Sequence, residues 1–294
     1  MACSIAKPER HPDLRKLEKR LLRQIGKAIG DYDLIREGDR IAVAVSGGKD
    51  SWTMLEMLER LRKRAPVRFS LVAVHVDQGF KDFQYDLVAD YLAAHGFEYR
   101  VYHSNSYQLI EDKIEPGVTY CSFCARIRRG VLYRAAKELG CNKIALGHHS
   151  DDAIETLLLN ILYQGRLAAM PPKLKADDGI SIVIRPLIYA SEQDLATFAY
   201  QLDPSTRKPI FPIVCCNCPV CGDDSLKRRR IKKLLLALEK EIPTVKHSLL
   251  SSLGNVHLSH LMDRDLWSVS ETSEGSSELW PALIKELSED GVEQ

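Results

Sequence analysis

The stretch that decides the fold is IAVAVSGGKDS, residues 41–51. Its first five residues form an apolar run that is too short for a helix, as expected of a strand buried on both faces of a parallel sheet. The adjacent glycines then allow a tight turn and a close backbone approach to a ligand, and a helical pattern follows from Trp52. The stretch therefore predicts a strand, a glycine turn and the N-terminus of a helix.

Apolar strand-like runs and helical patterns alternate along the rest of the chain. Helical spacing of apolar residues predicts helices at 13–29, 52–62, 85–94, 126–139 and 226–239. Short apolar runs predict further strands at 69–76, 99–102, 143–146 and 182–184. This alternation predicts an α/β fold with a doubly wound parallel sheet and right-handed crossovers.

The composition is that of an ordinary globular protein. With 45% hydrophobic and 28% charged residues among 294, the chain is neither collagen-like, disordered nor a disulfide-rich miniprotein. No apolar run reaches the roughly 20 residues that span a bilayer, and residues 1–10 lack the apolar stretch of a secretory signal. We therefore expect a cytoplasmic protein without a membrane partner.

The glycine turn has the composition of a phosphate-binding loop. Backbone amides at a helix N-terminus favour phosphate, Lys49 adds a positive charge, and two serine hydroxyls add donors. The spacing matches neither the GxxxxGK[ST] loop nor the GxGxxG fingerprint. A purely structural turn is the alternative. The predicted phosphate-binding residues are Ser46, Gly47, Gly48, Lys49, Asp50 and Ser51.

A second polar cluster, Gly-His-His-Ser-Asp-Asp, occupies residues 147–152, directly after the predicted strand at 143–146. Ligands of open α/β sheets bind at the carboxyl ends of the strands. We therefore expect His148 and Asp152 to contact the nucleotide, and Asp50 with Asp151 or Asp152 to hold Mg²⁺. Helix N-capping by one of these aspartates is the alternative.

The cysteines form two tight groups. Cys121 and Cys124 make one C-x2-C pair, and residues 215–221 contain Cys215, Cys216, Cys218 and Cys221. Disulfides are rare in a reducing compartment, and this spacing lets two thiolates converge on one metal. Two such pairs predict either a structural zinc site or an iron–sulfur site.

Charge is segregated along the chain although the net charge is only +1. Residues 1–30 and 227–233 are basic, whereas residues 263–294 are acidic. Dense basic blocks attract a polyanion, because neutralising phosphates releases counterions, although such a run can also be a solvated helix face. The cations predicted to contact RNA are Arg126, Arg128, Arg129, Lys227, Arg228, Arg229 and Arg230.

The motifs together resemble a known family. The turn at 46–51 resembles the PP-loop of the ATP pyrophosphatase superfamily, whose fold is adenine-nucleotide alpha-hydrolase-like. Over about residues 13–262 the chain further resembles the tRNA 2-thiocytidine synthetases. The motifs that carry this resemblance are CSFCARIRRG (121–130), IALGHH (144–149), MPPKL (170–174), IRPL (184–187) and the Cys-Gly at 221–222.

The resemblance implies an activity and its cofactors. Members of that family use ATP, with Mg²⁺, to adenylate the C2 oxygen of an anticodon-loop cytidine in tRNA and replace it by sulfur. It implies a [4Fe-4S] cluster on Cys121, Cys124 and Cys221, with Cys218 and Cys216 as alternatives for the third ligand. It also implies that Asp77 contacts the adenosine, and that a cysteine desulfurase or another donor supplies the sulfur. A homodimer is compatible with the sequence, which does not fix the oligomeric state.

Four segments follow from these patterns. We expect a basic N-terminal helical segment (1–39), a PP-loop ATP-binding domain (40–202), a Cys-rich and basic helical appendage (203–269) and an acidic, poorly ordered tail (270–294). Compared with the sequence pattern of that family, residues 201–209 look like an insertion. Alternative functions are thiolation of a tRNA uridine, amidation with ammonia, or zinc-bridged RNA binding without catalysis. Amidation leaves the cysteines unexplained, and simple RNA binding leaves the phosphate loop unexplained.

Overall fold

The computed structural model of the chain describes residues 14–80, 84–104, 120–176, 178–202, 209–214 and 227–262, with the backbone alone at 120–122. One compact unit ends at Ser251. The second unit begins at Ser252, and its described part contains the 3₁₀ helix η1 (Leu258–His260). Cys216, Cys218, Cys221 and the acidic tail at 270–294 lie outside the described residues.

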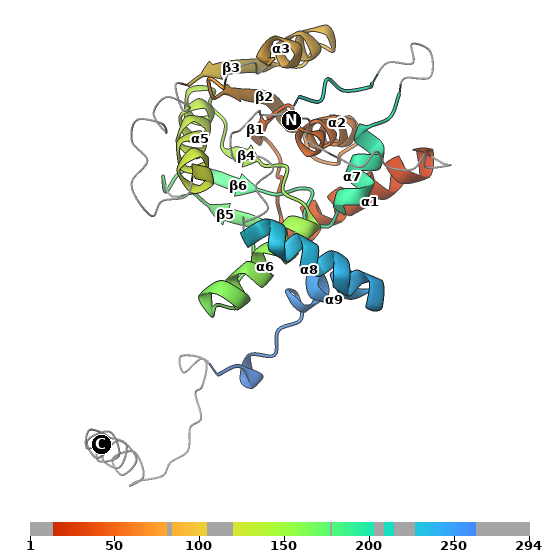
Figure 1. The fold of residues 1–294 in the computed structure, drawn as a ribbon. Coiled ribbons are helices and arrows are strands. Elements are labelled where there is room, and N and C mark those ends of the chain that lie inside the picture. Colours follow the sequence, from red (N-terminus) through yellow and green to blue (C-terminus); the bar gives the residue numbers. More distant parts are fainter. Residues whose placement is uncertain are drawn as a thin grey trace, which may run out of the picture. The chain divides into compact units, whose positions relative to one another are not determined.

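The centre of the first unit is a sheet whose described strands follow the order β3-β2-β1-β4-β6-β5 (Figure 1). All neighbouring pairs are parallel except β5 with β6. The predicted α/β fold with a wound, largely parallel sheet is therefore confirmed. The strands are β1 (Arg40–Ala44), β2 (Ser70–Asp77), β3 (Tyr99–His103), β4 (Lys143–Ala145), β5 (Lys173–Lys175) and β6 (Ile182–Ile184).

The antiparallel edge strand β5 was not predicted from the sequence, and neither were the helices Ser150–Gln164 and Glu192–Ala199. Strand β5 joins β6 through a short hairpin turn, in which Ala176 N–H donates to Ser181 O over 2.8 Å. Asp178 stabilises this turn by accepting from the backbone N–H groups of Ile180 and Ser181, each at 2.9 Å. A turn this short can connect only antiparallel strands, because a parallel pair needs a longer crossover.

Helices cover both faces of the sheet. Helix α5 lies on one face, and α2, α7 and α1 lie on the other (Figure 1). Helix α1 presents the buried residues Leu17, Leu21, Ile25 and Ala28 to this layer, as its helical spacing predicted. The helices are α1 (Leu14–Tyr32), α2 (Lys49–Arg62), α3 (Tyr85–Ala94), α5 (Tyr120–Glu138), α6 (Ser150–Gln164), α7 (Glu192–Ala199), α8 (Lys227–Glu241) and α9 (Val245–Ser252).

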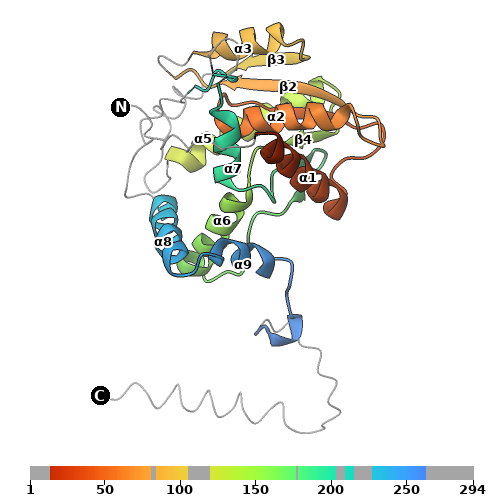
Figure 2. The ribbon, with the colours of Figure 1, turned by 90° about the vertical axis from the view of Figure 1, so that its right-hand side faces the viewer.

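Helix α8 packs against α6, and both views of the ribbon show the two side by side (Figures 1 and 2). Ile231 and Leu235 of α8 are buried against Ile154 of α6. This contact brings the basic helix beside the end of α6 that follows β4. The division into segments at 39, 202 and 269 stays a prediction. No helix within the described ranges is long and apolar enough to cross a membrane.

Candidate functional site

The glycine turn links β1 to α2 in the predicted way. Gly47 adopts φ +84°, and Gly48 caps the N-terminus of α2. Ser51 Oγ donates to Gly48 O over 2.8 Å, and Ser46 N–H donates to Ser51 Oγ over 3.2 Å. The two serines therefore brace the turn, while the first amides of α2 lie where an anion is stabilised by the helix dipole.

Residues 209–214 lie across this turn. Val214 N–H donates to Gly47 O over 3.0 Å, and Trp52 Nε1 donates to Pro212 O over 3.2 Å. The ring of Phe211 is stacked on Trp52, with the ring planes 8° apart. The segment that precedes the cysteine group at 215–221 is thus anchored on the phosphate loop.

Lys49 is the cation of the loop. Its Nζ lies 2.9 Å from Asp50 Oδ2 and 3.4 Å from Glu192 Oε1. Burial lowers the pKa of Lys49, but the two carboxylates outweigh burial and raise it, so the amine is charged at neutral pH. Burial raises the pKa of Glu192, but Lys232 and Lys49 outweigh it and lower that pKa to about 2.

The polar cluster after β4 forms the start of α6. His149 caps the helix, and its N–H donates to Asp152 Oδ2 over 3.1 Å, which completes a capping box. Asp151 is buried, and its Oδ2 accepts from Glu192 N–H over 2.8 Å and from Ser150 Oγ over 3.2 Å. Asp151 and Asp152, which the sequence predicted to bind Mg²⁺ or the nucleotide, therefore also accept hydrogen bonds from the protein itself.

Cations from α8 and α9 meet these carboxylates. Arg228 Nη1 lies 3.0 Å from Asp152 Oδ1, and Lys232 Nζ lies 2.6 Å from Glu192 Oε2. Lys246 Nζ lies 3.3 Å from Asp151 Oδ1. The first pair joins the first turn of α8 to the start of α6, the second joins α8 to α7, and the third joins α9 to α6.

A cleft of about 650 Å³ opens between the phosphate loop, the end of β4 and helix α5, a volume typical of small-molecule sites. The predicted residues that line it are Ser46, Gly48, Lys49, Asp50, Ser51, His148, Asp152, Arg128 and Arg129. Gly47, Asp77, Asp151, Arg126 and the cations at 227–230 do not line it. Asp77 instead accepts from Gly79 N–H and contacts His103 Nδ1, both at 3.0 Å.

Two side chains of the cleft carry buried nitrogens without a hydrogen-bond partner in the described part of the chain, His148 Nδ1 and Arg185 Nε. Burial lowers the pKa of His148, and so do the positive charges of Arg185, Arg228 and Arg128. Asp152 raises this pKa, but the net result is a pKa of about 4. The imidazole is therefore neutral at pH 7. Burial also lowers the pKa of Arg185, but a guanidinium stays charged in proteins.

Helix α5 begins at Tyr120, six residues before the predicted start at Arg126, so Cys121 and Cys124 belong to its first turns. Cys124 Sγ donates to Gln78 Oε1 over 2.9 Å, and Gln78 lines the cleft. Ala125, the next residue, lines it as well. Among the residues the structure describes, no three His, Cys, Asp or Glu side chains converge as a metal site.

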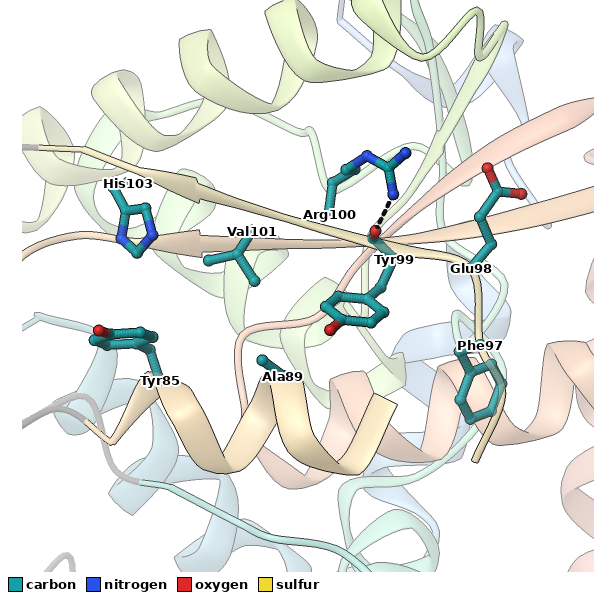
Figure 3. Close-up of a pocket in the computed structure, with 8 residues that line it drawn as sticks. All are labelled: Tyr85, Ala89, Phe97, Glu98, Tyr99, Arg100, Val101 and His103. Carbon is teal, nitrogen blue, oxygen red and sulfur yellow. Dashed lines mark hydrogen bonds between the residues drawn. The ribbon is translucent and has the colours of Figure 1, made fainter. Parts of the chain in front are cut away.

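A second hollow, of about 500 Å³, lies between α3 and the edge strand β3 (Figure 3). Tyr85 meets His103 edge to face there, with 5.3 Å between the ring centroids. None of the residues predicted to bind ligands lines this hollow. We therefore assign the site to the cleft at the phosphate loop, where charged and polar groups from three strand ends converge.

Arg185, Glu192 and Lys246 were not predicted as site residues from the sequence. Arg185 carried a usable signal, because a charged residue directly follows the apolar strand 182–184. Glu192 and Lys246 have no such signal in the sequence, because each lies at the site only through the packing of its helix. Lys227, which was predicted to contact RNA, places its Nζ 4.9 Å from the ring centroid of Tyr163.

Comparisons with known proteins agree with this geometry. A family model described as a PP-loop domain matches residues 17–205. The tRNA-cytidine(32) 2-sulfurtransferase of Geobacter sulfurreducens is 53% identical over 248 residues, covering 84% of this chain and 94% of that protein. The enzyme of the same name from Anaeromyxobacter sp. is 52% identical and covers 86% of this chain and 81% of its own length.

One solved structure has a similar fold. It is the U34-tRNA thiolase NcsA from Methanococcus maripaludis with its [4Fe-4S] cluster. The TM-score is 0.66 at 23% sequence identity, with 88% of this chain and 85% of that chain covered. At this identity the likeness supports the fold alone.

Proposed function

The chain belongs to the tRNA-cytidine(32) 2-sulfurtransferase family, with its PP-loop ATP-binding domain, and from this premise we propose that it thiolates cytidine 32 of tRNA at C2. ATP first adenylates the C2 oxygen, which turns a poor leaving group into a good one. Sulfur then attacks C2 and AMP leaves. The resemblance seen in the sequence implies the same activation step and product for an anticodon-loop cytidine, and position 32 comes from the names of the relatives.

The observation that carries the proposal is that α5, the helix of Cys121 and Cys124, lines the cleft of the phosphate loop, and that described residues on both sides of the segment 215–226 contact residues at this cleft. Helix α5 lines the cleft from Ala125, the residue after Cys124. Residues 215–226, which carry the other cysteine group, are flanked by two anchors at the cleft. These anchors are the bond from Val214 N–H to Gly47 O and the ion pair of Arg228 with Asp152. Nucleotide activation and sulfur delivery then take place in one cavity.

The chain's own residues account for the activation step. Lys49 and the amides at the start of α2 hold the triphosphate, and they stabilise the pyrophosphate that leaves when the C2 oxygen attacks the α-phosphorus. Arg128 and Arg129 line the same cleft from α5 and neutralise phosphates of the incoming RNA. A single unstacked loop base then enters beside the α-phosphate.

The positions of the cysteines in the sequence support the proposal of an iron–sulfur cluster. Cys121 and Cys124 occupy positions three apart on α5, and such positions lie on the same side of a helix. Cys221 is the proposed third ligand, with Cys218 and Cys216 as alternatives. These three cysteines would hold a [4Fe-4S] cluster, and the cluster would supply iron–sulfur chemistry beside the nucleotide.

The remaining ligands and partners are proposals as well. We assign Mg²⁺ to Asp50 and Asp152, which line the cleft. Asp151, the other predicted ligand, does not line it. A cysteine desulfurase or another sulfur carrier supplies the sulfur. The homodimer and the cytoplasmic location stay predictions.

The test is anaerobic purification followed by iron, sulfide and zinc counts and by mass spectrometry of the nucleosides in treated tRNA. Lys49→Ala should abolish release of AMP and pyrophosphate but keep the brown absorbance of the cluster. Cys121→Ala should lose colour and thiolation, whereas Cys141→Ala, which changes a buried cysteine outside the cleft, should keep both. Full colour and activity in Cys121→Ala, or one zinc and no iron in the wild type, would contradict the proposal.

A further inference from the structure

Arg185 is a buried cation whose hydrogen-bonding capacity is only partly used. It follows β6, is 8% exposed and lines the cleft. Its Nη1 donates to Pro171 O over 2.6 Å, but its Nε has no partner within the described residues. Burying a charged donor without a partner is costly, so such a group in a cleft indicates a ligand that supplies acceptors.

The strand order indicates which ligand this is. The phosphate loop follows β1, His148 follows β4 and Arg185 follows β6, and these strands are neighbours in that order. Arg185 is therefore separated from the phosphate loop by a whole strand. The proposed function assigns the triphosphate to Lys49 and the α2 amides, on the β1 side. The β6 side of the cleft is left for the molecule that receives the adenylyl group.

The receiving molecule is a tRNA base if the proposed function holds, and on that basis we propose that Arg185 reads the Watson–Crick edge of the target base and selects cytosine over uracil. Cytosine presents two adjacent acceptors, O2 and N3. Uracil presents O2 but carries a hydrogen on N3. A guanidinium can only donate hydrogen bonds. The Nε edge of Arg185 could therefore donate to both O2 and N3 of cytosine, whereas in uracil it would face the N3–H donor.

This contact would also position the reacting atom. A guanidinium is rigid and planar, and its bond to Pro171 O fixes its orientation. The contact would hold the base through O2, the atom that attacks the α-phosphorus, and through the adjacent acceptor N3. A bidentate contact of this kind discriminates between bases by roughly 5- to 150-fold.

The experiment compares two anticodon stem-loop RNAs that differ only in cytidine or uridine at the target position. The wild type should favour the cytidine RNA, both in kcat/KM for thiolation and in binding affinity. Arg185→Gln offers one donor and one acceptor, which match uracil, and should reduce this preference by at least about 5-fold. Arg185→Lys keeps the charge without the fork and should weaken binding of the cytidine RNA.

Arg128→Gln is the matched control, since Arg128 lines the same cleft but is exposed. It should weaken both RNAs by the same factor. A second measurement needs no variant: 3-deazacytidine at the target position lacks the N3 acceptor and should bind the wild type at least about 5-fold more weakly than cytidine. ATP binding and the unfolding midpoint report whether each variant is folded.

Several results would overturn the proposal. These are an unchanged cytidine-to-uridine ratio in folded Arg185→Gln, full affinity for the 3-deazacytidine RNA, or a raised KM for ATP with the ratio intact. The last result would make Arg185 a phosphate ligand. Absence of thiolation in the wild type would contradict the proposed function instead, while the binding preference would still decide the role of Arg185.

Discussion

Replacing Gly47 by alanine tests how the phosphate loop is held. The residue has φ +84°, where a side chain is strained, and a Cβ built there would lie 2.2 Å from Val214 Cγ2. Val214 has little freedom to move, because it is β-branched and its N–H is bonded to Gly47 O over 3.0 Å. The substitution therefore either displaces residues 209–214 or distorts the turn.

The size of the effect follows from these two contributions. Left-handed backbone costs about 1–2 kcal/mol for a residue with a Cβ. Overpacking against a fixed neighbour costs about 1–3 kcal/mol more. We expect Gly47→Ala to lower the free energy of unfolding by about 2–5 kcal/mol, which is a large share of the 5–15 kcal/mol of a typical domain.

Urea denaturation with a double-mutant cycle separates the contributions. Gly96→Ala is the matched control, because Gly96 has φ +69° and no atom within 4 Å of its Cβ position, so it should lose only about 1–2 kcal/mol. Val214→Ala removes the clashing methyl and should restore about 1–3 kcal/mol in the double variant. Equal losses at Gly47 and Gly96, or no coupling to Val214, would refute the argument.

Two further predictions concern buried titratable groups. Lys143 Nζ lies 2.6 Å from Asp39 Oδ2, and both groups are buried. Lys143→Met should therefore lower the free energy of unfolding, measured by urea denaturation, by about 3–5 kcal/mol. A loss under about 1 kcal/mol would contradict this. Burial raises the pKa of Asp39, but Lys143, the backbone N–H of Arg36 and the side-chain amide of Asn142 lower it overall. The wild type should therefore lose the stabilisation by Lys143 as pH falls below about 4, and the variant should not. The pKa of His148 is lowered to about 4, so the unfolded chain takes up a proton that the folded chain does not, and stability should fall as pH drops from about 6.5 to 4. NMR titration of the imidazole checks that pKa, and a His148→Gln variant with an unchanged pH profile of unfolding would argue against it.

The parts of the fold that local sequence determines were predictable. The first strand, the glycine turn and the following helix lie in one short stretch, and apolar periodicity identified β2, β3, β4 and β6 within one residue at most termini. Strand β5 was missed, since three residues at an exposed edge carry no usable period. Helix α5 was predicted too short, because the Cys-x2-Cys spacing at its start suits a metal-binding loop and a helical turn equally well.

The charges around the loop depend on tertiary packing, and this limited the prediction of the site. Lys49 forms an ion pair with Glu192 of α7, and Glu192 forms a second ion pair with Lys232 of α8. A motif can thus indicate that a loop binds phosphate, but not which carboxylates and cations surround it. Arg228 illustrates the difference. From sequence it belongs to a basic block suited to RNA, yet the packing of α8 on α6 pairs it with Asp152 at the cleft. A phosphate group that entered the cleft beside Asp152 would therefore compete with this carboxylate for Arg228.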